Sequence, residues 1–275
     1  MKKRVLHPTW DSLRVVFFLL LGVFATGTAF ASTIRISNPK IELELAPGET
    51  YSGEIAVENP DSDEVKTKIY LEDWNYAPGG TGEKKFFPAG TTALSASRWI
   101  TFSPSAEVLK PFGRIVERYT VTVPQDAKGG YTSVLFFESI LGTAPTEEEG
   151  VNVLVAGRIG ALFFIHVKGT EKRTGEIQKL EIVPPEGNKP LEIRTTLADT
   201  GNIDLAVGGN FLIMDTEGKV LGRGDLAKLY TLPGDIAESK TQWVGRLPKG
   251  NYSLLLTYDL GQGQSLVREE SLNVA

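Results

Sequence analysis

Residue types that usually carry out catalysis are sparse in this chain. The only histidine after His7 is His166, which stands in the apolar run 161–167, and there is no cysteine. A Ser-His-Asp site needs its histidine at a cleft, whereas zinc sites need several His or Cys ligands. The sequence also has no phosphate loop, dinucleotide fingerprint or nucleophile elbow. We therefore expect a protein without catalytic activity, metal or cofactor, in which His166 is a packed or edge residue.

Two acidic turns have the ligand type that calcium prefers. Asp61, Asp63 and Glu64 lie close together, as do Asp215 and Glu217. Neither group has the ligand spacing of an EF-hand loop, and aspartate is common in hairpin turns that bind no metal. We interpret both groups as turns.

The first 31 residues have the layout of a secretory signal peptide. A basic start at Lys2 to Arg4 precedes an apolar run at 15–24, and Ala29-Phe30-Ala31 supplies a small-x-small cleavage pattern. The apolar run is short for a bilayer span. We expect cleavage before Ser32 and export to the periplasm, with the cell surface as a second location. An uncleaved N-terminal anchor is the alternative.

The charge of the chain argues against several classes of partner. The 275 residues include 29 basic and 34 acidic residues, and the signal holds four of the basic residues and one of the acidic ones, so the remainder has a net charge of about −8. Nucleic-acid binding requires a basic stripe. No later segment reaches 18 consecutive apolar residues, so we expect no membrane span after signal cleavage.

Alternation of apolar and polar residues predicts strands along most of the mature chain. Clear examples are 41–45, 119–123 and 159–167, and turn residues recur every eight to twelve positions. This pattern is typical of antiparallel sandwiches. The predicted fold class is all-β, with two immunoglobulin-like antiparallel β-sandwich domains in tandem after the signal peptide. Only 105–110 and 224–229 are candidates for a single helical turn.

A polar stretch divides the strand pattern into two blocks. Residues 168–175 (KGTEKRTG) are charged, end in glycine and separate two apolar strands. We place an N-terminal sandwich at 32–168, a linker at 169–175 and a C-terminal sandwich at 176–275. The segments 75–97 and 142–150 are predicted as long loops. Trp74 and Trp243 are expected in the cores.

Several segments together resemble the periplasmic chaperones of pilus assembly, which have two immunoglobulin-like domains behind a signal peptide. The resemblance covers about residues 33–167. It is carried by Thr33-Ile34-Arg35-Ile36, Ile55-Ala56-Val57-Glu58-Asn59, Trp99-Ile100-Thr101-Phe102-Ser103-Pro104, Leu109-Lys110-Pro111 and Arg158-Ile159.

The resemblance implies a mechanism of strand donation to an exported subunit, a pilin-like protein or an adhesin. The candidate donor strand contains Val151, Val153 and Val155, which alternate along one face. An ordinary internal strand, covered on both sides, is the alternative. The expected binding surface is this sheet edge or the interdomain cleft, and the deciding observation is whether the segment lies at an exposed edge that faces the cleft.

The same family holds the terminal carboxylate of its subunit with basic residues. Arg35 falls on the first of these positions. The second position is a lysine in the family and is Gly160 in this chain, so Arg158 is the candidate substitute. Arg35 and Arg158 complete the set of expected partner-binding residues.

A second resemblance is to Gram-positive surface accessory proteins that bind peptidoglycan and a partner protein. It is carried by Leu45-Ala46-Pro47-Gly48-Glu49-Thr50, Val57-Glu58-Asn59, Val123-Pro124-Gln125-Asp126-Ala127, Gly129-Gly130-Tyr131 and Thr200-Gly201-Asn202. Such proteins usually end in a membrane helix and a basic tail, which the sequence up to Ala275 lacks. The alternative function is therefore an envelope or surface module that recognises glycan or a partner adhesin.

Overall fold

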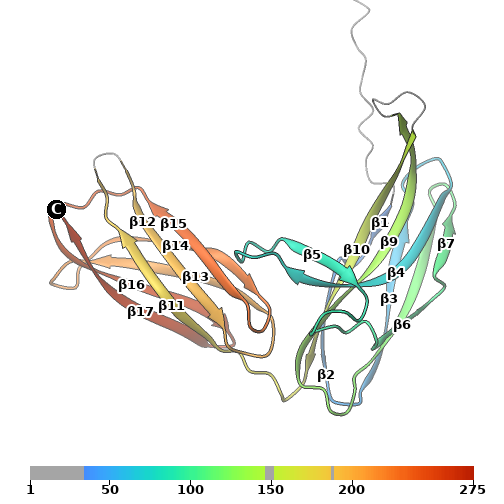
Figure 1. The fold of residues 1–275 in the computed structure, drawn as a ribbon, viewed down its shortest axis with the longest axis horizontal. Helices are drawn as coiled ribbons and strands as arrows, with labels where there is room; N and C mark the ends of the chain where they lie inside the picture. Colours follow the sequence, from blue (N-terminus) through green and yellow to red (C-terminus); the bar gives the residue numbers. More distant parts are fainter. Residues whose placement is uncertain (1–33, 146–151, 187–188) are drawn as a thin grey trace, which may run out of the picture. The chain divides into compact units, whose positions relative to one another are not determined.

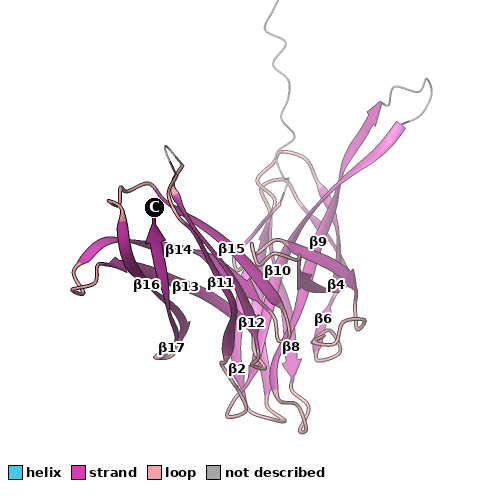
Figure 2. Ribbon diagram, turned by 60° about the vertical axis from the view of Figure 1, so that its left-hand side comes forward, coloured by secondary structure: helices cyan, strands magenta, loops and turns pink. Residues whose placement is uncertain are grey.

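The computed structural model describes residues 34–145, 152–186 and 189–275. The signal peptide, Val151 and the acidic run at 147–149 lie outside the described residues. Residues from Thr33 to Ala275 form one compact unit. The described part of the chain consists of strands and connecting loops (Figure 2), and it holds no helix with the length and hydropathy of a membrane span. The all-β prediction is confirmed.

The first ten strands build two facing sheets (Figure 1). The smaller sheet has the order β1-β3-β8-β6, and the larger has the order β2-β10-β9-β4-β5, with β7 also paired to β4. Their bounds are β1 Arg35–Ile36, β2 Lys40–Leu45, β3 Thr50–Glu58, β4 Val65–Tyr76, β5 Lys84–Pro88, β6 Ile100–Ser103, β7 Ala106–Leu109, β8 Arg114–Thr122, β9 Gly129–Pro145 and β10 Asn152–Val167.

The last seven strands build a second pair of sheets, with the orders β11-β12-β15 and β14-β13-β16-β17. Among the described residues, these sheets share no strand with the first pair. Their bounds are β11 Gly175–Val183, β12 Leu191–Asp199, β13 Leu205–Met214, β14 Val220–Thr231, β15 Ile236–Trp243, β16 Gly250–Gly261 and β17 Gln264–Val274. We refer to the two pairs of sheets as the first and the second sandwich.

Strand alternation places one apolar core inside each sandwich. In the first, β10 points Ala161, Phe163 and Ile165 inward, and all three are fully buried. In the second, the core centres on Phe211 and Tyr258. Burial of such side chains contributes about 1.5–3 kcal/mol each, which gives both sandwiches a core without disulfides.

A third apolar cluster lies on the outer face of the larger sheet of the first sandwich. Trp74, Val134, Phe136 and Phe164 are buried there, together with Leu232 of the second sandwich. Trp74 is therefore buried, as expected, but outside the sandwich core. The strands that supply these residues are apolar on both faces, which explains their continuous apolar runs.

Two local predictions are wrong. The segments 105–110 and 224–229 were candidates for helical turns, but the first contains β7 and the second lies within β14. Pairing with β4 and β13 decides both cases, because a ladder satisfies more backbone groups than an isolated turn. The predicted loop 75–97 also contains a strand, β5, which forms a hairpin with β4.

Candidate functional site

The most distinctive feature of the first sandwich is the unequal pairing of β10. One side of β10 pairs with β9 along its whole length, from Asn152 opposite Pro145 to Val167 opposite Gly129. The other side pairs with β2 only from Leu162 to Val167. Over 152–161, no strand of the described chain extends the sheet beyond β10. This segment is a sheet edge, the arrangement that strand donation requires.

The first part of this segment, residues 152–156, projects beyond the rest of its sheet. Pairing of β9 with β4 ends at Ser139, opposite Thr67, so β9 and β10 continue as a two-stranded ribbon (Figures 1 and 2). A register shift opposite Val155 and Ala156 leaves one extra residue in β9. Such bulges strengthen the local twist and often mark functional edges.

The structure places the predicted donor residues only in part. Val153 lies opposite Ala144 and Val155 opposite Gly142, both in the ribbon. Val151 lies outside the described residues. The assignment of these three valines to partner binding therefore stays a prediction. In the described part of the chain, the segment from Asn152 onward pairs on one side only.

The two predicted basic residues lie in different sheets. Arg35 is exposed in β1 of the smaller sheet, opposite Glu58. Arg158 lies on the outer face of β10, where its guanidinium is 4.0 Å from the ring centre of Phe136. Arg158 also forms an ion pair with Glu72 at 3.1 Å and donates a hydrogen bond to the Tyr70 hydroxyl. Because Glu72 already neutralises Arg158, a ligand carboxylate at this residue would have to compete with it.

Steric crowding explains why a glycine, Gly160, stands at the position where the pilus-chaperone resemblance implies a lysine. A Cβ atom at Gly160 would lie 2.7 Å from Val134 Cγ2 and 2.9 Å from Phe136 Cε1. Real Cβ atoms essentially never approach other atoms so closely, so the aromatic packing of the outer face occupies the space of any side chain at position 160.

A cavity that sequence reasoning missed lies on the same outer face. It has a volume of about 520 Å³ and is lined by residues of both sandwiches. Three of its lysines lie over aromatic rings: Lys40 is 4.8 Å from the Phe164 centroid, Lys84 is 5.2 Å from that of Tyr76, and Lys228 is 5.3 Å from that of Tyr230. We call these three residues the lysine cluster.

The lysine cluster is only partly neutralised. Lys40 forms an ion pair with Glu42, whereas the described contacts of Lys84 are the rings and the carbonyl oxygen of Gly82. Burial lowers the pKa of Lys84, and the nearby charge of Lys40 lowers it further. Two lysines that repel each other beside an open cavity would be stabilised by an anion.

His166 connects the sandwiches near this cavity. Its Nε2 atom lies 2.6 Å from Asp204 Oδ1, and both side chains are largely buried. Backbone hydrogen bonds from Gly130 to Asn202 and from Tyr230 to Gly80 also join the two sandwiches. The predicted role of His166 as a packed residue agrees with this contact, and no group of three or more candidate metal ligands occurs among the residues that the structure describes.

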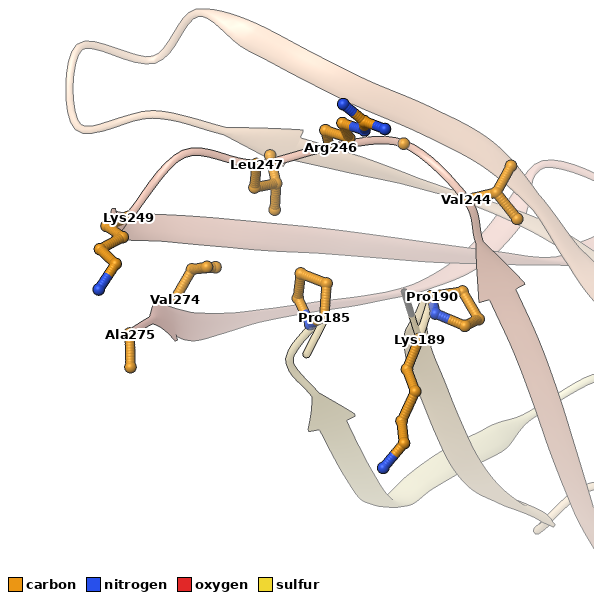
Figure 3. Close-up of a pocket in the computed structure, with 10 residues that line it drawn as sticks. Pro185, Lys189, Pro190, Val244, Arg246, Leu247, Lys249, Val274 and Ala275 are labelled. Atoms are coloured by element: carbon orange, nitrogen blue, oxygen red, sulfur yellow. The ribbon is translucent and has the colours of Figure 1, made fainter. Parts of the chain in front are cut away.

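A larger cavity, of about 550 Å³, lies at one end of the second sandwich. Its lining includes Lys189, Arg246 and Lys249. Figure 3 shows Arg246 directed to one side and Lys189 and Lys249 to the other, with the ends of the three side chains apart instead of converging on one position. We therefore give this cavity less weight as a binding site than the lysine cluster.

Comparison with known proteins gives a likeness in fold. No family model matches the chain, and no curated protein matches it. Among solved structures, the class 5 fimbriae chaperone CfaA is 15% identical with a TM-score of 0.40, and the alignment covers 86% of this chain and 98% of CfaA. The chaperone–tip adhesion subunit complex CsuC–CsuE of Acinetobacter baumannii gives 14% identity and a TM-score of 0.42, with coverage of 86% and 98%.

A third similar structure is the Salmonella enterica SafA pilin in complex with the SafB chaperone. It is 11% identical with a TM-score of 0.40, and the alignment covers 88% of this chain and 97% of that one. The solved structures to which this chain is similar thus include pilus-assembly chaperones. At these identities and scores, the likeness assigns no role to any residue of this chain.

Proposed function

We propose that this protein is a non-catalytic, pilus-chaperone-like protein that binds another exported chain by β-strand pairing. The observation that carries the proposal is that, among the residues the structure describes, β10 pairs on one side only over 152–161. A sheet edge of this kind presents a row of backbone donors and acceptors that a strand of another chain can pair with. The partner would be a pilin-like or adhesin subunit whose own sheet lacks a strand.

We further propose that the lysine cluster holds the terminal carboxylate of that subunit. This assignment replaces part of the role predicted for Arg158, whose charge is neutralised by Glu72. Lys84 supports the proposal best, because it has a lowered pKa and lies beside a second cation. The role of Arg35 stays a prediction.

The proposed location is the periplasm, after removal of residues 1–31. The division into 32–168, a linker at 169–175 and 176–275 is kept as part of the proposal. It agrees with the position of the linker between β10 and β11, which belong to different sheets.

Strand pairing is tested by co-purification with an exported subunit whose sheet lacks one strand. Val153→Asp places a charge in the ribbon and is expected to lower recovery of the subunit at least tenfold. Val267→Asp is the matched control, because Val267 is a 60% exposed valine in β17 of the second sandwich. Equal recovery with both variants would show that β10 is not the binding element. If the protein is retained on peptidoglycan and does not bind the subunit, the envelope-module alternative is favoured.

The carboxylate anchor is tested separately with the Lys84→Gln variant and with a subunit whose C-terminus ends in one added, amidated residue and so carries no charge. Amidation should weaken binding of the subunit to the parent protein, but should have little further effect on its binding to the Lys84→Gln variant. If amidation weakens binding to both proteins equally, Lys84 does not hold the carboxylate.

A further inference from the structure

A buried carboxylate in the first sandwich has no described cation as a partner. Glu117 lies in the middle of β8 and is 1% exposed. Alternation along β8 points Glu117 inward with Tyr119 and Val121, while Arg118 points to solvent. One of its carboxylate oxygens, Oε1, is buried without a hydrogen-bond partner. Burial of an unpaired polar group is costly.

The surroundings of Glu117 are apolar, neutral or acidic. Ile55, fully buried, lies opposite it on β3. From the next strand, β6, it is approached by the backbone of Ser103, and from β7 by the carboxylate of Glu107. Two arginines of β8 and two glutamates of β3 point outward as the exposed pairs Arg118–Glu54 and Arg114–Glu58.

A second unpaired polar atom lies at the same end of the sandwich. Thr67 of β4 is 2% exposed and its Oγ1 atom has no partner. Thr67 lies opposite Glu107 in the pairing of β4 with β7. This end of the core therefore holds two buried oxygens that are left unsatisfied, next to a half-buried carboxylate.

The strands that cover Glu117 are the shortest of their sheets except β1. β6 and β7 have four residues each. In the described chain, β6 pairs only with β8 and β7 only with β4. They follow each other closely in sequence and form a corner at the edge of the sandwich (Figure 1). Each of these two strands is therefore held to its sheet by a single ladder.

We propose that Glu117 makes the first sandwich responsive to pH. When Glu117 is protonated, the corner of β6 and β7 stays seated on the core; when Glu117 loses its proton to solvent, the corner opens. The inference is independent of the proposed function, because it concerns the fold of the first sandwich alone.

Electrostatics set the range in which this change occurs. Burial raises the pKa of Glu117 from 4.5 to about 7, and the charge of Glu107 adds to the increase. The folded state thus binds the proton more tightly than the unfolded state. Stability from this group is complete below pH 4.5, falls as the pH rises to about 7 and is constant above it. The expected change in the folding equilibrium is on the order of a hundredfold, since each pKa unit is tenfold.

The experiment combines a titration with hydrogen exchange on the purified protein. The side-chain carboxyl carbon of Glu117, followed by NMR, should titrate with a midpoint near pH 7. Amide protection at 106–109, corrected for the intrinsic exchange rate, should fall at least tenfold between pH 5.5 and pH 8. Glu117→Gln should keep its protection at both pH values. Glu54→Gln, which alters an exposed carboxylate on the opposite face, should behave like the parent.

Three results would overturn the proposal. A Glu117 midpoint at or below pH 5 would show that the buried carboxylate tolerates its charge. Equal protection of 106–109 in the parent at both pH values would show that the corner does not open. If Glu117→Gln fails to fold, Glu107→Gln provides the test. Removal of the neighbouring charge should lower the pKa of Glu117, so the corner should open at a lower pH. An unchanged midpoint of opening would contradict the proposal.

Discussion

The larger sheet of the first sandwich and the sheet β11-β12-β15 of the second differ in their outer faces. The former buries Trp74, Phe136 and Phe164 on its outer face. The latter carries ion pairs instead: Glu192 lies 2.5 Å from Arg194 and 2.6 Å from Lys240. An apolar outer face that is buried beneath other segments acts as a second core, whereas one covered by paired charges remains solvated.

The difference concerns the edges as well as the faces. β10 begins at Asn152, but its pairing with β2 begins only at Leu162. In the second sandwich, the exposed edge strand β17 carries Arg268, Glu269 and Glu270, and charges of this kind discourage edge-to-edge pairing. The first sandwich is therefore the better candidate for partner binding, and four substitutions test this comparison.

The largest expected effect comes from Trp74→Ala compared with Trp243→Ala. Trp74 is fully buried, its ring lies 5.1 Å from that of Phe164, and its Nε1 donates to the Ser133 carbonyl oxygen. Its removal should lower the free energy of unfolding by about 3–5 kcal/mol. Trp243 is only half-buried beside Gly245, so its removal should cost less. Urea unfolding measures both, and equal losses would mean that the outer face is not a second core.

The second effect concerns Asp73, a fully buried carboxylate that organises residues 91–97. It accepts hydrogen bonds from the Ser95 and Ser97 hydroxyls and from the Thr91 and Thr92 amides. Burial alone would raise the pKa of Asp73, but these hydrogen bonds outweigh it and lower the pKa. Stability from Asp73 is therefore present above pH 3.8 and is lost as the pH falls below it.

Asp73→Asn should destabilise the protein by about 2 kcal/mol, because an amide cannot accept all these hydrogen bonds. Its counterpart in the second sandwich is Glu192, whose pKa is lowered to about 2, mainly by its hydrogen bond with Lys240. Glu192→Gln should also weaken acid stability, but without loosening residues 91–97. Amide exchange of 91–97 separates the two, and unchanged exchange in Asp73→Asn would contradict the role of the carboxylate.

Much of the fold follows from alternation in the sequence, and the reasons for the failures are local. The strands at 41–45, 119–123 and 159–167 were predicted because their inward residues are apolar. β7 and β14 were missed because their mixed sequences do not reveal which strand they will pair with. The run Leu135-Phe136-Phe137 was a usable signal for a sheet buried on both faces, since three successive apolar residues must point to both sides.

The candidate site was less accessible to sequence reasoning. The edge of β10 over 152–161 depends on where β2 begins, which no local pattern specifies. Lys40, Lys84 and Lys228 are far apart in sequence and meet only in the folded chain. Arg158 was identified by resemblance alone, and its pairing with Glu72 became apparent only when β4 and β10 were seen to flank β9.

A third, smaller effect is expected from Gly160→Lys, which restores the residue that the pilus-chaperone resemblance implies. The new side chain would meet Val134 and Phe136 at less than 3 Å. Overpacking of this kind costs about 1–3 kcal/mol. Gly208→Lys is the matched control, because no atom lies within 4 Å of a Cβ atom there. If Gly160→Lys is fully stable and binds a subunit more tightly, the anchor lies at position 160 and not in the lysine cluster.

The smallest effect distinguishes two arginines that both form ion pairs. Arg158 stacks on Phe136 and pairs with Glu72, whereas Arg118 pairs with Glu54 on an exposed face, with 81% of its side chain accessible. Lysine keeps the charge but loses the planar stacking. Arg158→Lys should therefore cost about 1 kcal/mol, and Arg118→Lys less than about 0.5 kcal/mol.

Subunit binding gives the Arg158 comparison its functional meaning. If Arg158 serves mainly to cover Phe136, Arg158→Lys should leave the affinity for a subunit unchanged while Lys84→Gln lowers it. If Arg158→Lys instead lowers affinity at least as much as Lys84→Gln, the guanidinium contacts the partner directly. In that case Glu72 would hold Arg158 in place only until a ligand carboxylate displaces it.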